Sequence, residues 1–514
     1  MNTIILGSFL LSLIHSILFF RSEVGISAIL FCIPAMFFII YILEKRGKIK
    51  SKAAMWLSVP ILLLSATYFI FNNTLFRIAN FGVIAVLFAI MVVWLTSNEL
   101  KLKFTLSKIL SVVFGPIEFF DDIIKNTRKL FKGKEEDKPK KSQIVKKILI
   151  AALISIPLVV VVMALLMSAD TVFADMFGGI AEYLEKLLTS EEIFYLILRV
   201  GLILILFTYI ASFIYNLVEE KTSYSVVEEV GSNHTFAIDK ITVNTILTIL
   251  NVIYLIFSGV QIMYLFARTG VGEDFDFANY ARTGFFQLMA VSFINFAILF
   301  VTSFIKKDTE KEVKLFDYAK IMKMAMCIFT VVIIFSSFYR MYLYEQEYGY
   351  TYLRLLVYFS LITELILMIP TILYLIGEKI NLLKTYLIII TGMYIILNYM
   401  NIDYVIAKKN IDRYFDDPKE NKIDFSYLSI NTGTDAIPQI KRLIEAEDVA
   451  LSANVTYYLN KEKVKLEEKM TWQEYNISKS RAKKMLEDIE EIKEGTVFED
   501  YKRYVTTRYQ NDEF

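Results

Sequence analysis

The sequence predicts an all-α integral membrane protein with about 11 transmembrane helices, followed by a small, mostly helical C-terminal extramembrane domain. Two observations support this fold class. First, the chain has 514 residues, of which 56% are hydrophobic and 15% aromatic, more than a soluble globular domain of this size contains. Second, the apolar residues form separate runs of bilayer length, and these runs stop near residue 401.

Each apolar run is long enough to cross a bilayer, because a helix rises about 1.5 Å per residue and the hydrocarbon core is about 30 Å thick. The first run lacks a basic n-region and a small-residue cleavage pattern, so we interpret it as a span and not as a signal peptide. The expected spans are residues 3–20, 26–43, 56–72, 79–96, 147–168, 193–216, 241–266, 284–305, 320–339, 355–376 and 384–401.

These spans divide the chain into four parts. Residues 1–96 are expected to hold four N-terminal transmembrane helices, and residues 97–146 a basic cytoplasmic amphipathic segment and a linker. Residues 147–401 are expected to form a seven-helix transmembrane core, and residues 402–514 the C-terminal domain. In that domain we expect one helix with Asp435 as its N-cap and another from Ser478 to a glycine stop at Gly495.

Lysine and arginine in short loops predict the orientation, since cytoplasmic loops are enriched in them. The basic loops are EKRGKIKSK after the second span, the segment 98–147, and KKDTEKEVK after the eighth. This pattern predicts a multi-pass protein of the cell (plasma) membrane with its N-terminus inside and, because the span count is odd, its C-terminal domain outside. Apolar and basic residues alternate at helical spacing over 102–132, which indicates a helix lying on anionic lipid.

Several classes of site are not expected. Cys32 and Cys327 both lie in apolar runs, and His15 and His234 are far apart in the sequence. They provide neither a disulfide framework nor the ligand set of a metal centre. No nucleotide-binding, zinc-protease or hydrolase motif is present, so no cofactor is expected. The net charge of +1 gives no sign of a nucleic-acid partner. The expected partners are the lipid bilayer and a further membrane protein.

Three polar residues fall near the middle of predicted spans: Asn251, Asn295 and Glu364. Ionisable groups inside a membrane are costly and therefore mark functional candidates. A carboxylate with amide partners at mid-depth suits a cation or proton pathway. The alternative is a neutral Glu364 that hydrogen-bonds across a helix interface and holds the bundle in register.

Arginine, aspartate and tyrosine residues gather at the expected outer ends of the spans. Guanidinium groups favour paired contacts with phosphate or carboxylate, so such a cluster suits a lipid headgroup, a lipid-linked intermediate or a peptide acid. The alternative is an aromatic belt whose ion pairs hold helix ends together. The candidate outer-face residues are Asp170, Arg199, Arg268, Tyr280, Arg282, Arg340, Tyr348 and Arg354.

Several segments resemble a known family along most of the chain. They include SADTVF at 168–173, YARTGFF at 280–286, YGYTYLR at 348–354, NIDYVIAKKNIDRY at 401–414 and TWQEYNISKSRA at 471–482. They are similar to bacterial polytopic proteins catalogued as domain of unknown function 4173, close to number 4153. The resemblance implies a plasma-membrane protein of unassigned activity and supplies no catalytic residue. The family-like tail motif comprises Asn410, Arg413, Asp424, Tyr427 and Trp472, which would lie over the arginine and tyrosine cluster if the tail docks there.

From these features we expect a non-enzymatic protein whose outer face, covered by the C-terminal domain, binds an anionic or amphipathic envelope component for sensing, partner support or transport. One alternative is an enzyme of the outer face that acts on a lipid-linked substrate, for which Asp170 is the candidate acidic residue. Another alternative is an assembly or signalling partner in the membrane.

Overall fold

The computed structural model describes residues 2–97, 191–219, 240–261, 277–303, 313–468 and 470–489. Every regular element in these ranges is a helix. The described residues divide into two compact units. The first unit holds residues 2–21, 37–46 and 191–219, and the second holds the others.

The first unit is built on the packing of α1 (Asn2–Phe19) against α9 (Glu191–Glu219). The rings of Phe9 and Phe207 meet edge to face, with their centroids 5.9 Å apart. The second half of α2 (Ser27–Lys45) belongs to this unit as well. It packs against α1 at Gly7, where an added Cβ would overlap the ring of Phe38.

The second unit contains a bundle of apolar helices. After the 3-10 turn η1 (Lys52–Leu57) come α3 (Ser58–Ile70), α4 (Thr74–Leu95), α11 (Lys240–Gln261), α12 (Phe277–Ser303), α13 (Val313–Tyr348), α14 (Tyr352–Ile376) and α15 (Leu382–Tyr399). Helix α13 packs against α11, α12 and α14, and α15 joins α14 to α3. Leu247, Leu299 and Ile333, all 0% exposed, lie in the core between α11, α12 and α13.

The predicted fold class is confirmed. Nine helical stretches within the described residues are long and apolar enough to cross a membrane, and α1 is a shorter apolar helix. The chain is therefore a multi-pass membrane protein. The expected span at 147–168 and the basic segment over 102–132 lie outside the described residues, so the count of about 11 is not confirmed.

Helix α13 is much longer than the expected span at 320–339. It runs without a break from Val313 to Tyr348, 36 residues, or about 54 Å at the rise of an α-helix. This length exceeds the hydrocarbon thickness of about 30 Å. Because a helix satisfies its own backbone hydrogen bonds, it continues into the polar region after the apolar residues end.

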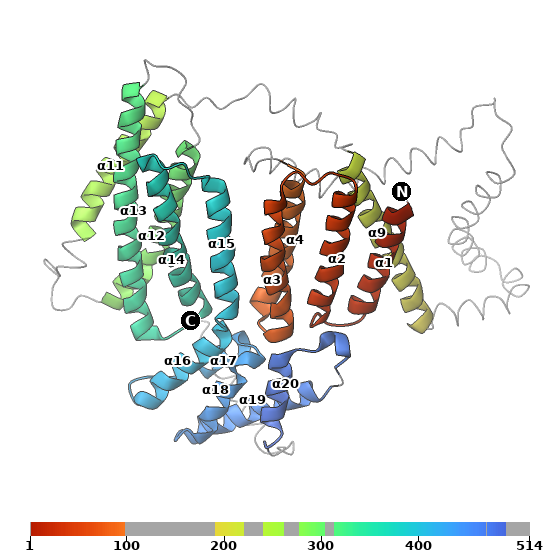
Figure 1. Cartoon of the computed structure of the whole chain (residues 1–514). Helices are drawn as coiled ribbons and strands as arrows, with labels where there is room; N and C mark the ends of the chain where they lie inside the picture. Colours follow the sequence, from red (N-terminus) through yellow and green to blue (C-terminus); the bar gives the residue numbers. More distant parts are fainter. Residues whose placement is uncertain are drawn as a thin grey trace, which may run out of the picture. The chain divides into compact units, whose positions relative to one another are not determined.

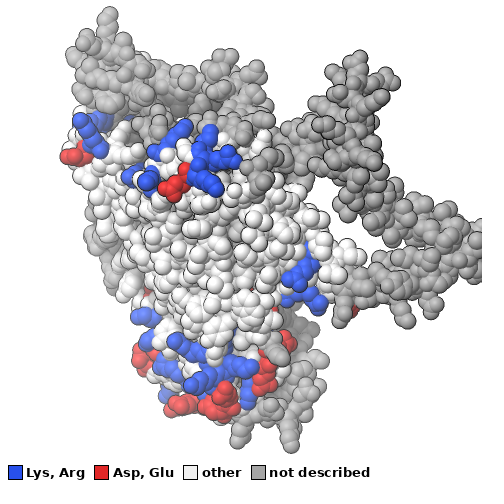
Figure 2. Space-filling model, turned by 45° about the vertical axis from the view of Figure 1, so that its right-hand side comes forward, with Lys and Arg blue, Asp and Glu red and all other residues white. Residues whose placement is uncertain are grey.

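The C-terminal domain, residues 402–489, is helical. Its helices are α16 (Ile402–Asp416), α17 (Phe425–Asn431), α18 (Ile437–Ile440), α19 (Val449–Glu467) and α20 (Ile477–Leu486), with 3-10 turns η4 (Thr434–Ala436), η5 (Lys441–Glu445) and η6 (Trp472–Glu474). They gather at one end of α3, α14 and α15 (Figure 1). In the view of Figure 2, charged side chains cover these helices, whereas the adjoining surface of the spans is largely uncharged.

This domain shares its hydrophobic core with the ends of the spans. Ile406, Ile440 and Leu459 are all 0% exposed, and the same cluster contains Phe76 of α4 and Leu397 of α15. The domain therefore packs directly on the membrane helices.

The two helices that we expected in this domain begin close to their expected positions, but with other caps. Helical structure runs without a break from Thr434 to Glu445 as η4, α18 and η5. Asp435 lies inside this run and is not its N-cap, and its carboxylate accepts a hydrogen bond from the backbone N–H of Asn72 at 2.6 Å. The next long helix, α19, is capped by Asp448. Helix α20 is capped by Asn476, two residues before the expected start at Ser478. The expected stop at Gly495 lies outside the described residues.

Candidate functional site

Arg354 of the expected arginine and tyrosine cluster closes the turn between α13 and α14. One of its Nη atoms donates to the carbonyl oxygens of Tyr348, at 2.8 Å, and Gly349. The guanidinium group lies 4.3 Å from the ring centroid of Tyr344, and the side chain is only 7% exposed. Tyr348 is 52% exposed. Arg354 is thus engaged in the turn and not presented to a ligand.

Residues of the tail motif hold the same turn from the other side. The side-chain amide of Asn410 makes two hydrogen bonds of 2.8 Å with the backbone N–H and carbonyl of Tyr350. Arg413 donates to the carbonyl oxygens of Glu345 at 3.2 Å and Glu347 at 3.1 Å. Gly349 of this turn has φ +74, and an added Cβ would lie 2.5 Å from Oδ1 of Asn410, so the position favours glycine.

The other tail-motif residues have different roles. Tyr427 accepts a hydrogen bond from the backbone N–H of Tyr352 at 2.9 Å, and Asp424 caps α17 by accepting one from the N–H of Tyr427. Trp472 is 58% exposed in η6. The expected docking of the tail therefore involves Asn410, Arg413 and Tyr427, which fasten the C-terminal domain to the connection between α13 and α14.

The remaining outer-face candidates belong to different units or fall outside the described residues. Arg199 lies in the first unit, where its Nε donates to Ser16 at 2.8 Å. Arg340 lies in the second unit, is 6% exposed and donates to Oε1 of Gln261 at 3.1 Å. Asp170 and Arg268 lie outside the described residues, and the side chains of Tyr280 and Arg282 are not described.

The three intramembrane candidates are all buried, but the hydrogen bonds of the described residues do not join them to one another. Asn251 donates to the carbonyl of Met322 at 2.8 Å. Asn295 accepts from the hydroxyl of Tyr254 at 2.5 Å and donates to Thr330 at 3.2 Å. Glu364 of α14 is 2% exposed, and neither of its carboxyl oxygens has a hydrogen-bond partner among the described residues.

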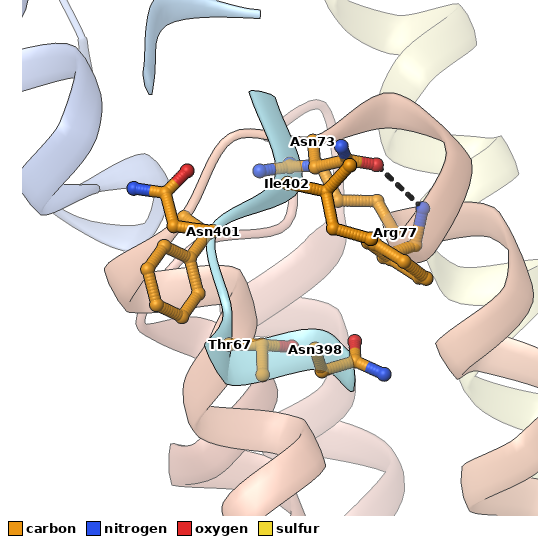
Figure 3. Close-up of a pocket in the computed structure, with 8 residues that line it drawn as sticks. Thr67, Asn73, Arg77, Asn398, Asn401 and Ile402 are labelled. Carbon is orange, nitrogen blue, oxygen red and sulfur yellow. Dashed lines mark hydrogen bonds between the residues drawn. The ribbon is translucent and has the colours of Figure 1, made fainter. Parts of the chain in front are cut away.

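A small pocket lies where the C-terminal domain meets the spans, and sequence reasoning did not single it out. It is formed by α3, α4, the end of α15 and the start of α16. Its lining residues are Thr67, Phe71, Asn73, Phe76, Arg77, Asn398, Asn401 and Ile402 (Figure 3). We call this the junction pocket. Figure 3 shows Asn73, Arg77 and Ile402 on one side and Thr67 with Asn398 on another.

Asn73 is the central residue of the junction. Its Oδ1 caps α4 by accepting from the N–H of Phe76 at 2.9 Å, the hydrogen bond drawn in Figure 3. Its Nδ2 donates to Oδ1 of Asp403 at 2.7 Å and to the hydroxyl of Tyr352 at 2.5 Å. The other oxygen of Asp403 accepts from the N–H of Gly433 at 2.9 Å. One amide thus links α4, α14 and α16.

The carboxyl groups at this junction are buried. Asp403 is 1% exposed, and burial raises its pKa to about 7, with the nearby Asp435 adding to the rise. Burial also raises the pKa of Asp435. Asn476 completes the junction, because its amide donates to the carbonyl oxygens of Tyr68 and Phe71, both at 2.8 Å. These contacts hold residues 403, 435 and 476 of the C-terminal domain against the end of α3.

Arg77 provides the positive charge of the junction pocket. Its side chain is half-buried, and its guanidinium group donates to Oδ1 of Asn72 at 3.3 Å and to the carbonyl of Val24. Among the described residues it forms no ion pair with a carboxylate. The nearby Glu23 instead pairs with Lys479 at 2.6 Å.

The amides of the junction pocket continue into a hydrogen-bonded chain below it. Nδ2 of Asn80 donates to Thr67 at 2.9 Å and to Oδ1 of Asn398 at 2.7 Å. The hydroxyl of Tyr394 donates to Oδ1 of Asn80 at 2.7 Å. Asn401 has a left-handed backbone, with φ +49, and caps α16. The pocket therefore has a fixed polar floor.

The sequence did contain a signal for this site. The segment NNTLFR at 72–77 places two adjacent asparagines and an arginine between two spans, and Asn398 and Asn401 flank the end of the last span. Polar amides at span ends also occur as ordinary helix caps, so only the fold shows that these two segments meet.

A comparison with family models matches residues 58–443 to the family described as a domain of unknown function, DUF4153. The match covers about three quarters of the chain. This chain belongs to that family. The expected resemblance named number 4173 with 4153 close to it, and the naming as 4173 is not confirmed. Searches of curated proteins and of solved structures gave no match.

The DUF4153 region contains all eight residues that line the junction pocket, together with Asp403, Gly433 and Asp435. It leaves out α1, α2 and Asn476. The pocket and most of the contacts that dock the C-terminal domain are thus part of the family domain.

Proposed function

We propose that this protein binds the anionic headgroup of an amphipathic envelope component, of which an anionic phospholipid is the simplest, in the junction pocket. The C-terminal domain covers the pocket and responds to its occupancy. The proposal keeps the expected ligand class and moves the site from Arg354 and its neighbours to Arg77.

The observation that carries this proposal is the guanidinium group of Arg77. It is half-buried at the wall of the junction pocket, and its partners among the described residues are neutral oxygens. A partly desolvated charge is stabilised most by an ion of opposite sign, and guanidinium groups favour phosphate and carboxylate. Arg354, by contrast, lies over the ring of Tyr344 and is only 7% exposed.

The rest of the lining suits an amphipathic molecule. The amide of Asn73 is fully engaged, so Asn398 and Asn401 are the amides that could meet a headgroup, and Phe71 and Phe76 provide apolar surface. The pocket lies at the ends of spans, where a lipid headgroup also lies. These features support recognition of a polar head attached to an apolar body.

The lining favours binding over catalysis. Its one hydroxyl group, on Thr67, donates to the carbonyl of Leu64 at 2.6 Å. The carboxyl group of Asp403 is held by Asn73 and Gly433 and does not line the pocket. The enzyme alternative requires Asp170, which lies outside the described residues, and it stays a prediction, as does the assembly or signalling alternative.

The proposed extracytoplasmic position rests on the charge of the loops. The C-terminal domain contacts residues 23–26, 71–73 and 345–352, which follow the first, third and ninth expected spans. All three connections are ones that we expected outside. Single cysteines at Ser429 and Ser142, with Cys32 and Cys327 replaced, test this in intact cells. Labelling by an impermeant maleimide at Ser429→Cys alone supports the proposal, and the reverse pattern contradicts it.

The ligand proposal is tested by native mass spectrometry of the purified full chain released from nanodiscs of phosphatidylglycerol or phosphatidylcholine. We expect the wild-type protein to retain phosphatidylglycerol, and Arg77→Gln to retain about tenfold less. Asn401→Gly removes an amide from the lining and suits the left-handed backbone, and we expect an intermediate loss. Lys384→Gln is the matched control, since Lys384 lies near the first turn of α15 beside Trp94.

Equal retention by Arg77→Gln and Lys384→Gln would contradict the proposal. A separate arm measures thermal stabilisation by inorganic phosphate in phosphatidylcholine nanodiscs. Stabilisation by phosphate that depends on Arg77, without retention of phosphatidylglycerol, would show a site for a free anion and overturn the assignment to a lipid.

A further inference from the structure

Glu364 is an acidic residue deep inside the membrane part of the second unit. It lies half-way along α14, with Leu361 and Met368 near it on the same helix. These neighbours are 0% and 2% exposed, and Glu364 itself is 2% exposed. The carboxyl group is thus surrounded by apolar packing at the depth of the hydrocarbon core.

The carboxyl group has no fixed partner. Neither oxygen accepts or donates a hydrogen bond within the described residues. Ser292 of α12 lies beside it, but the hydroxyl of Ser292 donates to the carbonyl of Met289 at 2.8 Å. Glu345, a second buried acid of the same unit, differs in this respect, since it accepts from the hydroxyl of Tyr358 at 3.0 Å.

The charged and titratable groups on the helices packed against α14 are engaged elsewhere. On α13, Lys323 donates to the carbonyl of Thr302 and Arg340 to Gln261. On α15, Lys384 lies over Trp94 and Tyr386 shares a hydrogen bond with Thr371. Other titratable groups on these elements and on α14 and α16 include Lys320, Glu345, Arg354, Tyr358, Tyr394 and Asp403, each hydrogen-bonded to a residue other than Glu364, and Cys327, a free cysteine. Among the described residues, none forms an ion pair with Glu364.

An ionised carboxylate without a cation or hydrogen-bond donor is strongly disfavoured at such a position, and the group takes up a proton instead. Ionisation requires a donor, and Ser292 is placed to supply one by turning its hydroxyl away from Met289. Asn295 lies three residues further along the same face of α12 and is hydrogen-bonded to Tyr254. Ser292 is thus the polar group that the structure places beside the acid.

From this arrangement we propose that Glu364 is an intramembrane proton-binding site, protonated at rest, which releases its proton to water when the contact between α12 and α14 opens. One carboxyl group becomes one carboxylate and one free proton, and the membrane domain changes its charge by one. The site is independent of the junction pocket.

The first experiment uses N,N′-dicyclohexylcarbodiimide, an apolar reagent that enters bilayers. A protonated carboxyl group adds across one C=N bond of the reagent and passes its proton to nitrogen. The acyl group then moves to nitrogen and gives a stable N-acylurea without a leaving group. The full chain in nanodiscs is treated at about pH 6 and about pH 9, and modified peptides are identified by mass spectrometry.

We expect an adduct on Glu364, about fivefold more abundant at the lower pH, and absent in Glu364→Gln. Glu378, exposed after the end of α14, is the internal comparison. No adduct on Glu364 while Glu378 or Asp403 is modified, or an adduct that does not depend on pH, would overturn the proposal.

A second measurement does not need access by a reagent. Gln is a neutral isostere of protonated Glu, so the melting temperatures of wild type and Glu364→Gln should differ least near about pH 4, where the carboxyl group is protonated in the packed and the unfolded state alike. A solvated carboxyl group ionises above about pH 4, whereas the buried one holds its proton, so the wild type should melt progressively lower than the variant as the pH rises to about 9, by several degrees in all. An unchanged difference in melting temperature over this range would show that the packed state does not hold a proton on Glu364.

Discussion

The contact of Gly433 with the end of α3 allows a sharp test of how the C-terminal domain is held. A Cβ added to Gly433 would lie closer to the backbone oxygen of Asn72 than atoms in real structures approach. The backbone of Gly433 has φ −88 and ψ −167, which alanine also adopts. In Gly433→Ala the backbone conformation is therefore allowed, and only the steric overlap with Asn72 is unfavourable. Residues 433–435 must move away from Asn72 to relieve it.

This movement breaks at least two partly buried hydrogen bonds, from Gly433 to Asp403 and from Asn72 to Asp435. Hydrogen bonds to charged groups contribute about 1.5–3 kcal/mol each. We therefore expect docking to weaken by about 3 kcal/mol, which raises the undocked population about a hundredfold. The assay is trypsin cleavage within α19 and α20 of the protein in nanodiscs, whose rate follows the open population when closing is fast.

Gly392→Ala is the matched control, because an added Cβ at Gly392 meets nothing within 4 Å. It should leave the cleavage rate unchanged. If Gly433→Ala is cleaved no faster than Gly392→Ala, the argument that the junction holds the C-terminal domain is wrong.

Two further predictions concern the same docking. Because burial raises the pKa of Asp403 to about 7, from about 3.9 in an unfolded chain, the docked state binds more protons between these values. The free energy of docking should therefore weaken by up to about 4 kcal/mol as the pH rises from about 4 to 7, and it should stay constant above about pH 7. The trypsin cleavage rate at each pH, normalised to the rate on a denatured substrate, measures this change. Asp403→Asn should remove most of the dependence of the cleavage rate on pH. Asn410→Ala removes both hydrogen bonds to Tyr350 and should increase cleavage about tenfold. Asn460→Ala, which removes a hydrogen bond within α19 only, should not increase cleavage. Equal cleavage rates for the two variants would show that the hydrogen bonds of Asn410 to Tyr350 do not hold the C-terminal domain.

The membrane helices were predictable because their signal is local. A run of about 20 apolar residues needs no knowledge of its neighbours to be recognised, and α2, α3, α4, α9, α11, α12, α14 and α15 lie close to their expected positions. The ends of α13 were less predictable, since charged residues near Tyr348 mark the end of the hydrocarbon and not the end of the helix.

The sites were less predictable because the side chains that form them come from distant segments. Asp435 precedes a plausible helix in the sequence, yet its carboxylate serves Asn72, which lies 363 positions earlier. Arg354 was a reasonable ligand-binding candidate by its chemistry, but its position after a tight turn gives it the carbonyl oxygens of that turn as partners. The resemblance placed the tail motif near that turn, and Asn410, Arg413 and Tyr427 do contact it.

The hydrophobic core shared by Phe76, Leu397 and the C-terminal helices has a consequence for biosynthesis. The residues of α16 to α20 leave the ribosome after the spans, and part of the apolar surface that they bury belongs to α4 and α15. Their packing can be completed only once those helices have been inserted and assembled. An error in insertion would leave Ile406, Ile440 and Leu459 in water, where proteases and chaperones recognise them. The helices α16 to α20 thus report whether the membrane helices that they pack on have assembled correctly.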